Sequence, residues 1–346
     1  MNLDDLQSIP VYTDVDKARF QDEIQPLHRP AILKGLANDW PIVTKAKESR
    51  RTLSDYIEGF EPGRPVKAFF ASPDIEGRYF YNDDFTGFNF RQRELPLAEL
   101  LGTLRRHEDD ERPPSVYAGA VQLTGRLEAL RDSNHHELLD DEMEQLVSIW
   151  IGNRGKTAIH WDLPQNIACV VAGQRRFTLF PPEQLPNLYI GPLDVTLAGQ
   201  PISLVDLNDP DLDRFPRFSE ALEAAQTAVM EPGDAIYVPS MWFHHVQNMS
   251  ALGVLINFWW RDAAPHMFTP LFTLFHALLS IRDLPADERE HWKRMFDHYI
   301  FREDRDPMPH VPEHARGVFQ DMTPERVVAL RNFLVHKLGG ELRRDK

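Results

Sequence analysis

The segment Thr157-Ala158-Ile159-His160-Trp161-Asp162 carries the strongest structural signal in the chain. In an extended segment alternate side chains share a face, so the side chains of His160 and Asp162 leave the backbone on the same side. An imidazole and a carboxylate then converge on one point, which indicates two ligands of a metal site. The chain contains 14 histidines, so a surface turn is the competing interpretation of this tripeptide alone.

A second segment, residues 231–248, supplies the third ligand. A Pro-Gly-Asp turn enters a short apolar strand there, and Pro239 ends that strand because proline cannot donate to a β-ladder. His244 is expected in the next turn, and its spacing from Pro239 favours it over His245 as the ligand. Two histidines and one carboxylate form the set that holds Fe(II) and leaves coordination positions open for a co-substrate and oxygen.

The two segments resemble the motifs of a known family. The second segment has the spacing of the second cupin motif at Gly233, Pro239, His244 and Asn248. Met241 stands where that motif usually has glycine, so the tight turn of the motif is in question. Residues from about 29 to 260 are similar to JmjC-type, cupin-like (cupin 8) 2-oxoglutarate oxygenases, above all to the asparaginyl hydroxylase group called factor inhibiting HIF and its bacterial cupin-like relatives. The stretches that carry the resemblance are residues 29–35, 150–152, 160–162, 179–184 and 257–259.

The resemblance implies a mainly β fold with helices. Its core is expected to be a double-stranded β-helix, a cupin-like jelly roll of antiparallel strands, and the short strands separated by turn signals fit such a core. The expected divisions are an N-terminal α/β scaffold at 1–114, the barrel core at 115–262 and a C-terminal helical region at 263–346.

Local patterns predict elements around the two segments. Residues 52–57 open a helix that Thr52 or Ser54 is expected to cap. Residues 66–81 are broken by turn residues, as in an early hairpin. Gly173-Gln174 is expected to make a hairpin turn between two strands of the barrel.

The resemblance also implies an activity. The chain is expected to be a 2-oxoglutarate-dependent dioxygenase, a hydroxylase that uses Fe(II), the co-substrate 2-oxoglutarate and O2. It would hydroxylate an unactivated carbon of a protein or peptide side chain, or of a small molecule. His160, Asp162 and His244 are the expected metal ligands and form the catalytic centre. Contacts to the co-substrate are expected from Tyr117, Thr157, Asn166, Arg175 and Asn257.

The co-substrate prediction depends most on Arg175. In the resembled hydroxylase a lysine after the His-X-Asp loop pairs with the distal carboxylate of 2-oxoglutarate, assisted by a threonine three residues before the first histidine. Arg175 and Thr157 stand at those positions, and a guanidinium can hold a carboxylate with two parallel hydrogen bonds. Thr157 and His160 would face opposite ways in a regular strand, so this assignment requires a bulge or bend between them.

Three other interpretations remain open at the level of the sequence. A metal-dependent cupin enzyme that does not use 2-oxoglutarate would keep the barrel and the metal but would need no carboxylate anchor. A non-catalytic binding module would use the metal structurally. In the third interpretation, Arg175 is held in a structural ion pair with one of the chain's own carboxylates.

Composition sets bounds on partners and location. The 346 residues are 42% hydrophobic, which is enough for a full core, and their net charge of −15 disfavours nucleic acid as a partner. Cys169 is the single cysteine, so an internal disulfide framework is excluded. No apolar run is long enough to span a membrane and the first residues are acidic, so a cytoplasmic location is expected.

The C-terminal region is expected to contain amphipathic helices between about 268 and 338, the last of them capped by Thr323 with Pro324 at its first position. Their apolar faces are wide for a terminal appendage, which predicts a homodimer formed through these helices. The alternative is that the same faces only cap the barrel.

Overall fold

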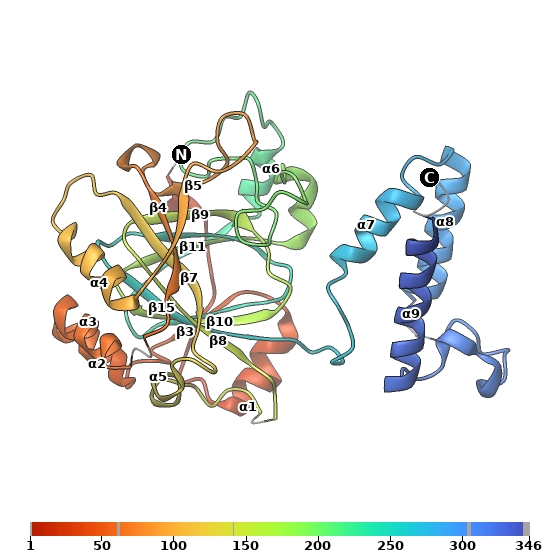
Figure 1. The fold of residues 1–346 in the computed structure, drawn as a ribbon, viewed down its shortest axis with the longest axis horizontal. Coiled ribbons are helices and arrows are strands. Elements are labelled where there is room, and N and C mark those ends of the chain that lie inside the picture. The colour runs from red at the N-terminus through yellow and green to blue at the C-terminus, as the bar shows by residue number, and fades with distance from the viewer. Residues whose placement is uncertain (1, 61–62, 141, 303–305, 342–346) are drawn as a thin grey trace. The chain divides into compact units, whose positions relative to one another are not determined.

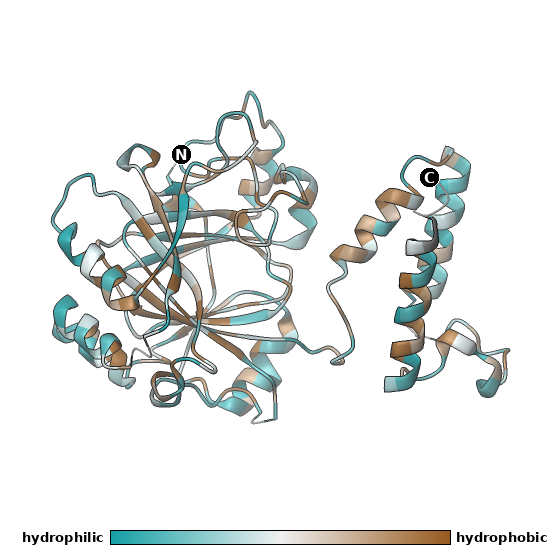
Figure 2. Cartoon of the chain, in the orientation of Figure 1, coloured by the Kyte–Doolittle hydropathy of each residue, from teal (hydrophilic) through white to brown (hydrophobic). Residues whose placement is uncertain are grey.

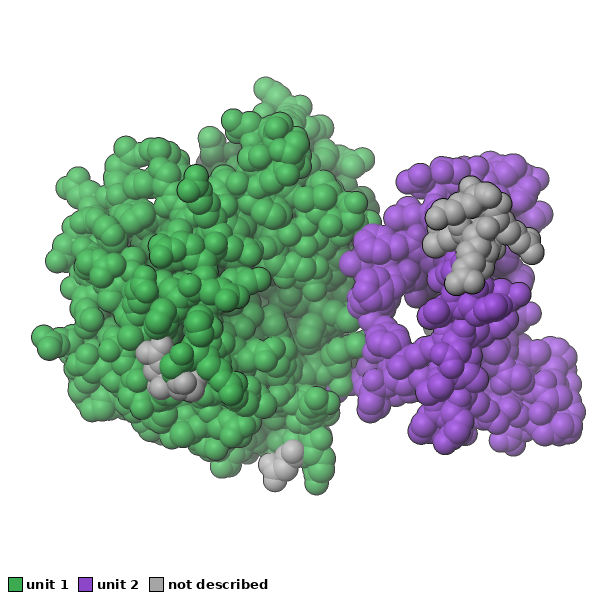
Figure 3. Space-filling model, viewed as in Figure 1, with its two compact units in different colours: residues 1–261 green, residues 262–346 purple. Residues whose placement is uncertain are grey.

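The computed structural model describes residues 2–60, 63–140, 142–302 and 306–341. Its internal contacts divide the chain into two compact units, residues 1–261 and residues 262–346 (Figure 3). The first unit contains two large β-sheets with helices around them, and the second unit is helical (Figure 1). Strands from the expected N-terminal scaffold lie in the same sheets as strands from the expected barrel core.

The first unit is built on a six-stranded and a nine-stranded sheet. In spatial order the smaller sheet contains β1 (Gln7–Ser8), β12 (Gln226–Met230), β11 (Arg175–Phe180), β14 (Phe243–Asn248), β9 (Gly155–His160) and β5 (Arg78–Tyr79). The larger sheet contains β2 (Val11–Thr13), β3 (Ala31–Lys34), β13 (Ala235–Val238), β10 (Gln165–Ala172), β15 (Gly253–Trp260), β8 (Leu146–Gly152), β7 (Ser115–Gln122), β4 (Val66–Ala71) and β6 (Arg91–Leu95).

Most neighbouring strands in both sheets are antiparallel. Within the described residues, parallel pairing occurs between β1 and β12, between β2 and β3, and between β5 and β9, and each of these pairs includes an edge strand. Two facing sheets of mainly antiparallel strands, with helices added outside them, confirm the expected cupin-like jelly roll.

The core lies on both faces of the larger sheet, and strand alternation explains why. On β10, Ala168 and Val170 face the smaller sheet and pack with Phe177 of β11, whereas Ile167 and Cys169 face outward into a second core. Every residue of β10 is buried. A strand covered on both faces needs a nearly continuous apolar sequence, and that is what this segment has.

Helices and a long insert cover the outer faces of the two sheets. The apolar sides of α2 (Pro41–Glu48), α3 (Arg50–Glu58) and α4 (Leu97–Arg106) pack in the outer core of the larger sheet. Residues 188–221, which include most of α6 (Phe218–Glu223), pack on the outer face of the smaller sheet. The remaining helices of this unit include α1 (Lys17–Arg19), which continues into a π-helical turn at Phe20–Ile24, and α5 (Glu128–Ser133).

Two hairpin predictions were wrong. Residues 66–81 form β4 in the larger sheet and β5 in the smaller one, so the two strands are not partners. Gly173, with φ +74°, also carries the chain between sheets, because β10 and β11 lie in different sheets. Turn residues mark where a chain reverses, but they do not specify which strand becomes the neighbour.

Two smaller predictions also differ from the structure. His244 lies within β14 and not in the turn that precedes it, because the turn after Pro239 is completed at Trp242. Ser49, and not Thr52 or Ser54, caps α3, since its Oγ accepts from the Thr52 main-chain N–H at 3.0 Å. The N-cap therefore lies three residues before Thr52, the earlier of the two predicted caps.

The second unit contains α7 (Leu271–Ser280), α8 (Ala286–Tyr299) and α9 (Pro324–Glu341). Thr323 caps α9 as predicted, with its Oγ1 accepting from the Arg326 main-chain N–H at 3.4 Å. None of the residues of α7 or α8 is buried. Most of α7 is hydrophobic, whereas α8 is mainly hydrophilic (Figure 2). Among the described residues, no helix has the length and apolar character needed to span a membrane.

Candidate metal centre

His160, Asp162 and His244 meet at one point in the first unit. His160 ends β9 and lies directly opposite His244 of β14, with ring centroids 4.2 Å apart. Asp162 follows β9, and one potential ligand atom from each of the three residues lies within 4.8 Å of the other two. In the described part of the chain, this is the one such cluster of metal-binding side chains.

A bulge in β9 makes this arrangement possible. Thr157 pairs with Val246 and His160 pairs with His244, so three steps along β9 match two steps along β14. Because β9 contains one extra residue there, Thr157 and His160 lie on the same face of the sheet. This is the irregularity that the placement of Thr157 beside the metal ligands requires.

Main-chain contacts set the orientation of both imidazoles. Nδ1 of His160 lies 2.8 Å from the carbonyl oxygen of Ala158, and Nδ1 of His244 lies 3.0 Å from that of Trp242. A carbonyl oxygen only accepts, so each Nδ1 donates and each Nε2 presents its lone pair to the centre. Nε2 of His244 is 3.6 Å from Oδ2 of Asp162.

Burial and neighbouring groups hold two of the ligands in forms that bind a cation. Burial, followed by the influence of His244, lowers the pKa of His160 to about 4. Burial alone would raise the pKa of Asp162, but its contact with His244 and the electrostatic influence of both imidazoles outweigh that effect and lower it. At neutral pH the site therefore offers a neutral imidazole and a carboxylate, the forms in which these groups coordinate a divalent ion.

The three residues line a cavity of about 60 Å³ between the two sheets. All eight site residues predicted from the sequence line it: Tyr117, Thr157, His160, Asp162, Asn166, Arg175, His244 and Asn257. The structure thus brings the expected metal ligands and the expected co-substrate contacts together in one place.

Arg175 enters this cavity from β11 as a buried cation. It is 5% exposed, no carboxylate of the described residues pairs with it, and its Nε has no hydrogen-bond partner. Burial lowers the pKa of Arg175 to about 10, an effect that Tyr117 partly offsets, so the guanidinium is still charged at neutral pH. The described residues therefore form no ion pair of the kind that the structural interpretation of Arg175 requires. A buried charge without a partner is unfavourable unless an anion binds to it.

Comparison with known proteins agrees with this geometry. The profile of the cupin-like domain family matches residues 17–266. The chain belongs to this family. It is 29% identical over 281 residues to tRNA wybutosine-synthesizing protein 5 of Danio rerio, covering 75% of this chain and 77% of that protein. It is 27% identical over 269 residues to the bifunctional peptidase and (3S)-lysyl hydroxylase JMJD7 of Homo sapiens, covering 70% and 79%.

A third relative is longer than this cupin-like protein. The chain is 24% identical over 274 residues to lysine-specific demethylase JMJ31 of Arabidopsis thaliana, covering 71% of this chain. The matched region is 48% of the plant protein, so the chain spans about half the length of that relative.

This cupin-like domain keeps the turn of its second motif without the usual glycine. Met241 has φ +66°, a left-handed conformation that glycine adopts without strain. Its main-chain N–H donates to the carbonyl oxygen of Asp162 at 3.0 Å, and the Ser240 hydroxyl donates to that of Leu163 at 2.7 Å. The turn is therefore tied directly to the loop that carries the carboxylate ligand.

The cavity of the cupin-like domain also contains residues to which the sequence assigned no role. Trp150 donates from Nε1 to Oδ1 of Asn257 at 2.6 Å, and Asn257 donates from Nδ2 to Oδ1 of Asn166 at 3.3 Å. Trp259 lines the same wall, and its buried Nε1 has no hydrogen-bond partner. Strand parity could have identified Trp259, because Asn257 and Trp259 share one face of β15.

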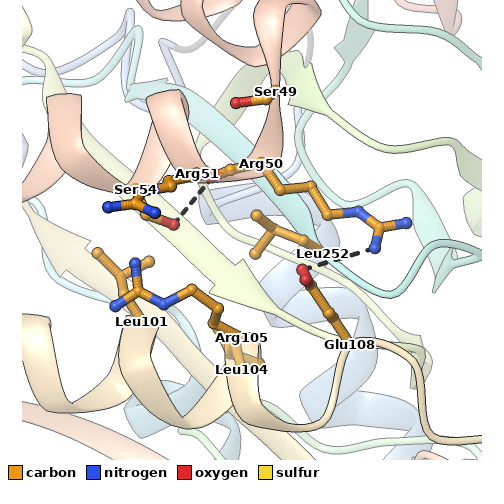
Figure 4. A pocket seen from close by; sticks show the side chains of 9 residues that line it. All are labelled: Ser49, Arg50, Arg51, Ser54, Leu101, Leu104, Arg105, Glu108 and Leu252. Carbon is orange, nitrogen blue, oxygen red and sulfur yellow. Dashed lines mark hydrogen bonds and ion pairs between the residues drawn. The ribbon is translucent and has the colours of Figure 1, made fainter.

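A larger cavity of about 270 Å³ lies between α3 and α4 but lacks the chemistry of the metal centre (Figure 4). Three arginines line it, and all three lie near carboxylates. Arg50 is 3.6 Å from Glu108, while Arg51 and Arg105 are 3.8 and 4.0 Å from Asp55. It contains no histidine and no cluster of metal-binding side chains. The candidate site is therefore the smaller cavity between the sheets.

Proposed function

We propose that this cupin-like domain is an Fe(II)- and 2-oxoglutarate-dependent oxygenase that hydroxylates an unactivated carbon. His160, Asp162 and His244 would hold the iron as two imidazoles and one carboxylate, which is the ligand set of such enzymes. The observation that carries the proposal is the pairing of this cluster with the unpartnered, buried Arg175 in one cavity. Neither a cupin enzyme that does not use 2-oxoglutarate nor a purely structural metal module accounts for that arginine.

The proposed roles of the remaining residues follow from their positions. Arg175 and Thr157 would bind the distal carboxylate of 2-oxoglutarate, with Tyr117 beside them. Asn166 and Asn257, joined by their hydrogen bond, would line the co-substrate site nearer the ligands. Bound Fe(II) would supply a redox centre at which 2-oxoglutarate, O2 and a C–H bond are converted to succinate, CO2 and an alcohol. The protein's own part is to position these reactants and to exclude water.

For the substrate we propose a protein or peptide side chain. The name of the human relative includes lysyl hydroxylase, and that of the plant relative includes lysine-specific demethylase. The Danio rerio relative is named tRNA wybutosine-synthesizing protein 5, but a net charge of −15 opposes attraction to a phosphate backbone. A small molecule is the alternative. Mass spectrometry of lysate proteins incubated with and without the enzyme should show a gain of one oxygen on a specific peptide, whereas oxidation of metabolites alone would favour the alternative.

For the quaternary state we propose a homodimer through the C-terminal helices. Large apolar side chains of the second unit are exposed, among them Phe272 (63%), Leu279 (82%) and Phe301 (69%). A second copy that covered these side chains would remove them from water. Light scattering at micromolar concentration should give twice the 40.0 kDa mass of one chain. A monomer mass would reject the dimer and leave the metal site unaffected.

A spectroscopic experiment tests the proposed co-substrate directly. Fe(II) and 2-oxoglutarate should be added to the protein without oxygen, and a weak visible charge-transfer band should appear that requires both. A band with the wild-type protein and its loss in Asp162→Ala would support the proposal. If iron-loaded protein gave no band with 2-oxoglutarate, the enzyme would be a cupin of another class.

A further inference from the structure

The cavity does not end at Arg175. A small extension of about 20 Å³ shares Tyr117, Thr157, Arg175 and Val246 with the metal cavity. Its other walls are formed by Tyr79, Gly152, Asn153, Gly155, Lys156 and Asn248. A space of this size accommodates about one water molecule or the end of a small ligand.

Two amide side chains of the extension already have their partners. Asn153 accepts from the main-chain N–H of Val116 at 3.0 Å and donates to a main-chain oxygen at 2.8 Å. Asn248 donates to the main-chain oxygens of Gly152 and Asn153 at 3.2 and 2.8 Å. These side chains shape the extension, and their hydrogen-bonding groups are directed at the main chain and not at a ligand.

Tyr79 and Arg175 differ from the amides. The Tyr79 side chain is 8% exposed, and its hydroxyl is buried without a hydrogen-bond partner. Nε of Arg175 is also buried without one. Burial, with a smaller influence of Tyr117, raises the pKa of Tyr79 well above its usual value, so this hydroxyl stays protonated. The extension thus presents a neutral O–H donor and a cation, and both lack a partner among the described residues.

Strand pairing explains why Tyr79 and Arg175 line the same extension. Across the smaller sheet Tyr79 pairs with Thr157, and Thr157 with Val246, which forms one row of side chains. In the row beside it Arg175 pairs with Asn248, and Asn248 with Gly155. Gly155 has no side chain, so its row is open next to the Tyr79 ring, and a Cβ there would lie 3.6 Å from that ring.

Packing holds the Tyr79 ring in place. Its centroid lies 5.6 Å from that of Phe90, 5.8 Å from that of Tyr117 and 6.1 Å from that of Phe69. These contacts involve the ring and not the hydroxyl, so phenylalanine should pack in the same way. The position of the hydroxyl is therefore fixed before any ligand binds.

We propose that Tyr79 donates a hydrogen bond to the distal carboxylate of the 2-oxo acid that Arg175 binds, and so helps to select a dicarboxylate. An oxygen of that carboxylate would satisfy both unpartnered donors. This inference rests on the proposed use of 2-oxoglutarate, and it adds a residue from the edge strand β5 to the co-substrate site. A 2-oxo acid without a distal carboxylate would not receive this hydrogen bond, so its affinity should not depend on Tyr79.

Calorimetric titration of the Fe(II)-loaded protein without oxygen tests the proposal. Wild type and Tyr79→Phe should each be titrated with 2-oxoglutarate and with 2-oxobutyrate, which lacks the distal carboxylate. We expect Tyr79→Phe to raise the Kd of 2-oxoglutarate about five- to thirtyfold, as for the loss of one hydrogen bond to a charged group. The Kd of 2-oxobutyrate should not change. The melting temperature of the free protein should be equal or higher, because a buried hydroxyl without a partner is removed.

Tyr81→Phe is the matched control. The Tyr81 hydroxyl donates to the carbonyl oxygen of Val195 at 2.6 Å, and Tyr81 lines neither cavity. Its removal should leave both affinities unchanged. Equal 2-oxoglutarate affinity in wild type and Tyr79→Phe would overturn the assignment, as would an equal loss for both acids. A wild-type protein that binds no 2-oxoglutarate would overturn the proposed function and this assignment together.

Discussion

His160 and His244 lie opposite each other on neighbouring strands. Between this pair and the Thr157–Val246 pair, β9 contains one residue more than β14. The same extra residue brings Thr157 to the face of the ligands. A regular strand would point Thr157 away from the cavity. One bulge thus combines the metal ligands and a co-substrate contact on a single strand, and the site depends on register as much as on residue identity.

Removal of a ligand should abolish iron binding. We expect His160→Ala, Asp162→Ala and His244→Ala each to weaken Fe(II) affinity by roughly a hundredfold or more. Even the mutation of a residue that only hydrogen-bonds to a metal ligand typically lowers metal affinity about ten- to a hundredfold. Competition with a chelator measures this. His245→Asn is the control, because His245 is the next residue on β14 and does not line the cavity. If His245→Asn abolished Fe(II) binding and His244→Ala did not, the assignment of His244 as the ligand would be wrong.

Arg175→Met should weaken the binding of 2-oxoglutarate without affecting the binding of Fe(II). The loss of a charge-assisted hydrogen bond is expected to raise the Kd of 2-oxoglutarate roughly ten- to two-hundredfold, while Fe(II) affinity stays the same. Arg176→Met is the matched control, since Arg176 points away from the cavity and pairs with Asp4 at 2.6 Å. Equal co-substrate affinity in a folded Arg175→Met protein would move the anchor elsewhere.

Met241→Gly should stabilise the protein. Met241 has a left-handed backbone and a side chain that is 40% exposed, so glycine would relieve strain and lose little packing. We expect an increase of about 1 kcal/mol in the free energy of unfolding, measured in urea on the metal-free protein. Met241→Ala keeps a Cβ and should give no such gain. A destabilised glycine variant would show that the Met241 side chain matters more than its backbone strain.

Buried His136 should make stability depend on pH. Burial, with a smaller influence of His135, lowers the pKa of His136 to about 3 from an ordinary 6.5. The unfolded chain therefore binds a proton that the folded chain does not, and folding loses stability as pH falls from 6.5 towards 3. At pH 5 the lowered pKa of His136 should reduce the free energy of unfolding by about 2 kcal/mol relative to neutral pH.

His136→Asn tests this contribution. Asparagine can still accept from the Leu138 main-chain N–H, as Nδ1 of His136 does at 3.2 Å. Urea unfolding of the metal-free variant at pH 7 and pH 5 should show a decline in stability smaller by about that amount than in wild type. Equal declines in the two proteins would mean that His136 takes up its proton in the folded state.

The site was predictable from the sequence where residue type and spacing carry the chemistry. His160, Asp162 and His244 are recognisable because imidazole and carboxylate groups at this spacing suit Fe(II). Strand partners were not predictable, because Gly173 shows that the chain turns but not that it enters the other sheet. Tyr79 could not be found at all. Its strand has two residues, and its place beside Thr157 depends on pairing between segments that are far apart in the sequence.

The most direct test of the proposed activity is the conversion of 2-oxoglutarate to succinate in air. Purified protein with Fe(II) should produce succinate slowly even without the natural substrate, and the Asp162→Ala variant should not. Wild-type protein treated with a chelator should stop producing succinate, and production should resume when Fe(II) is added back. If wild-type protein with bound Fe(II) produced no succinate above the level of Asp162→Ala, the account of this domain as a 2-oxoglutarate oxygenase would be contradicted.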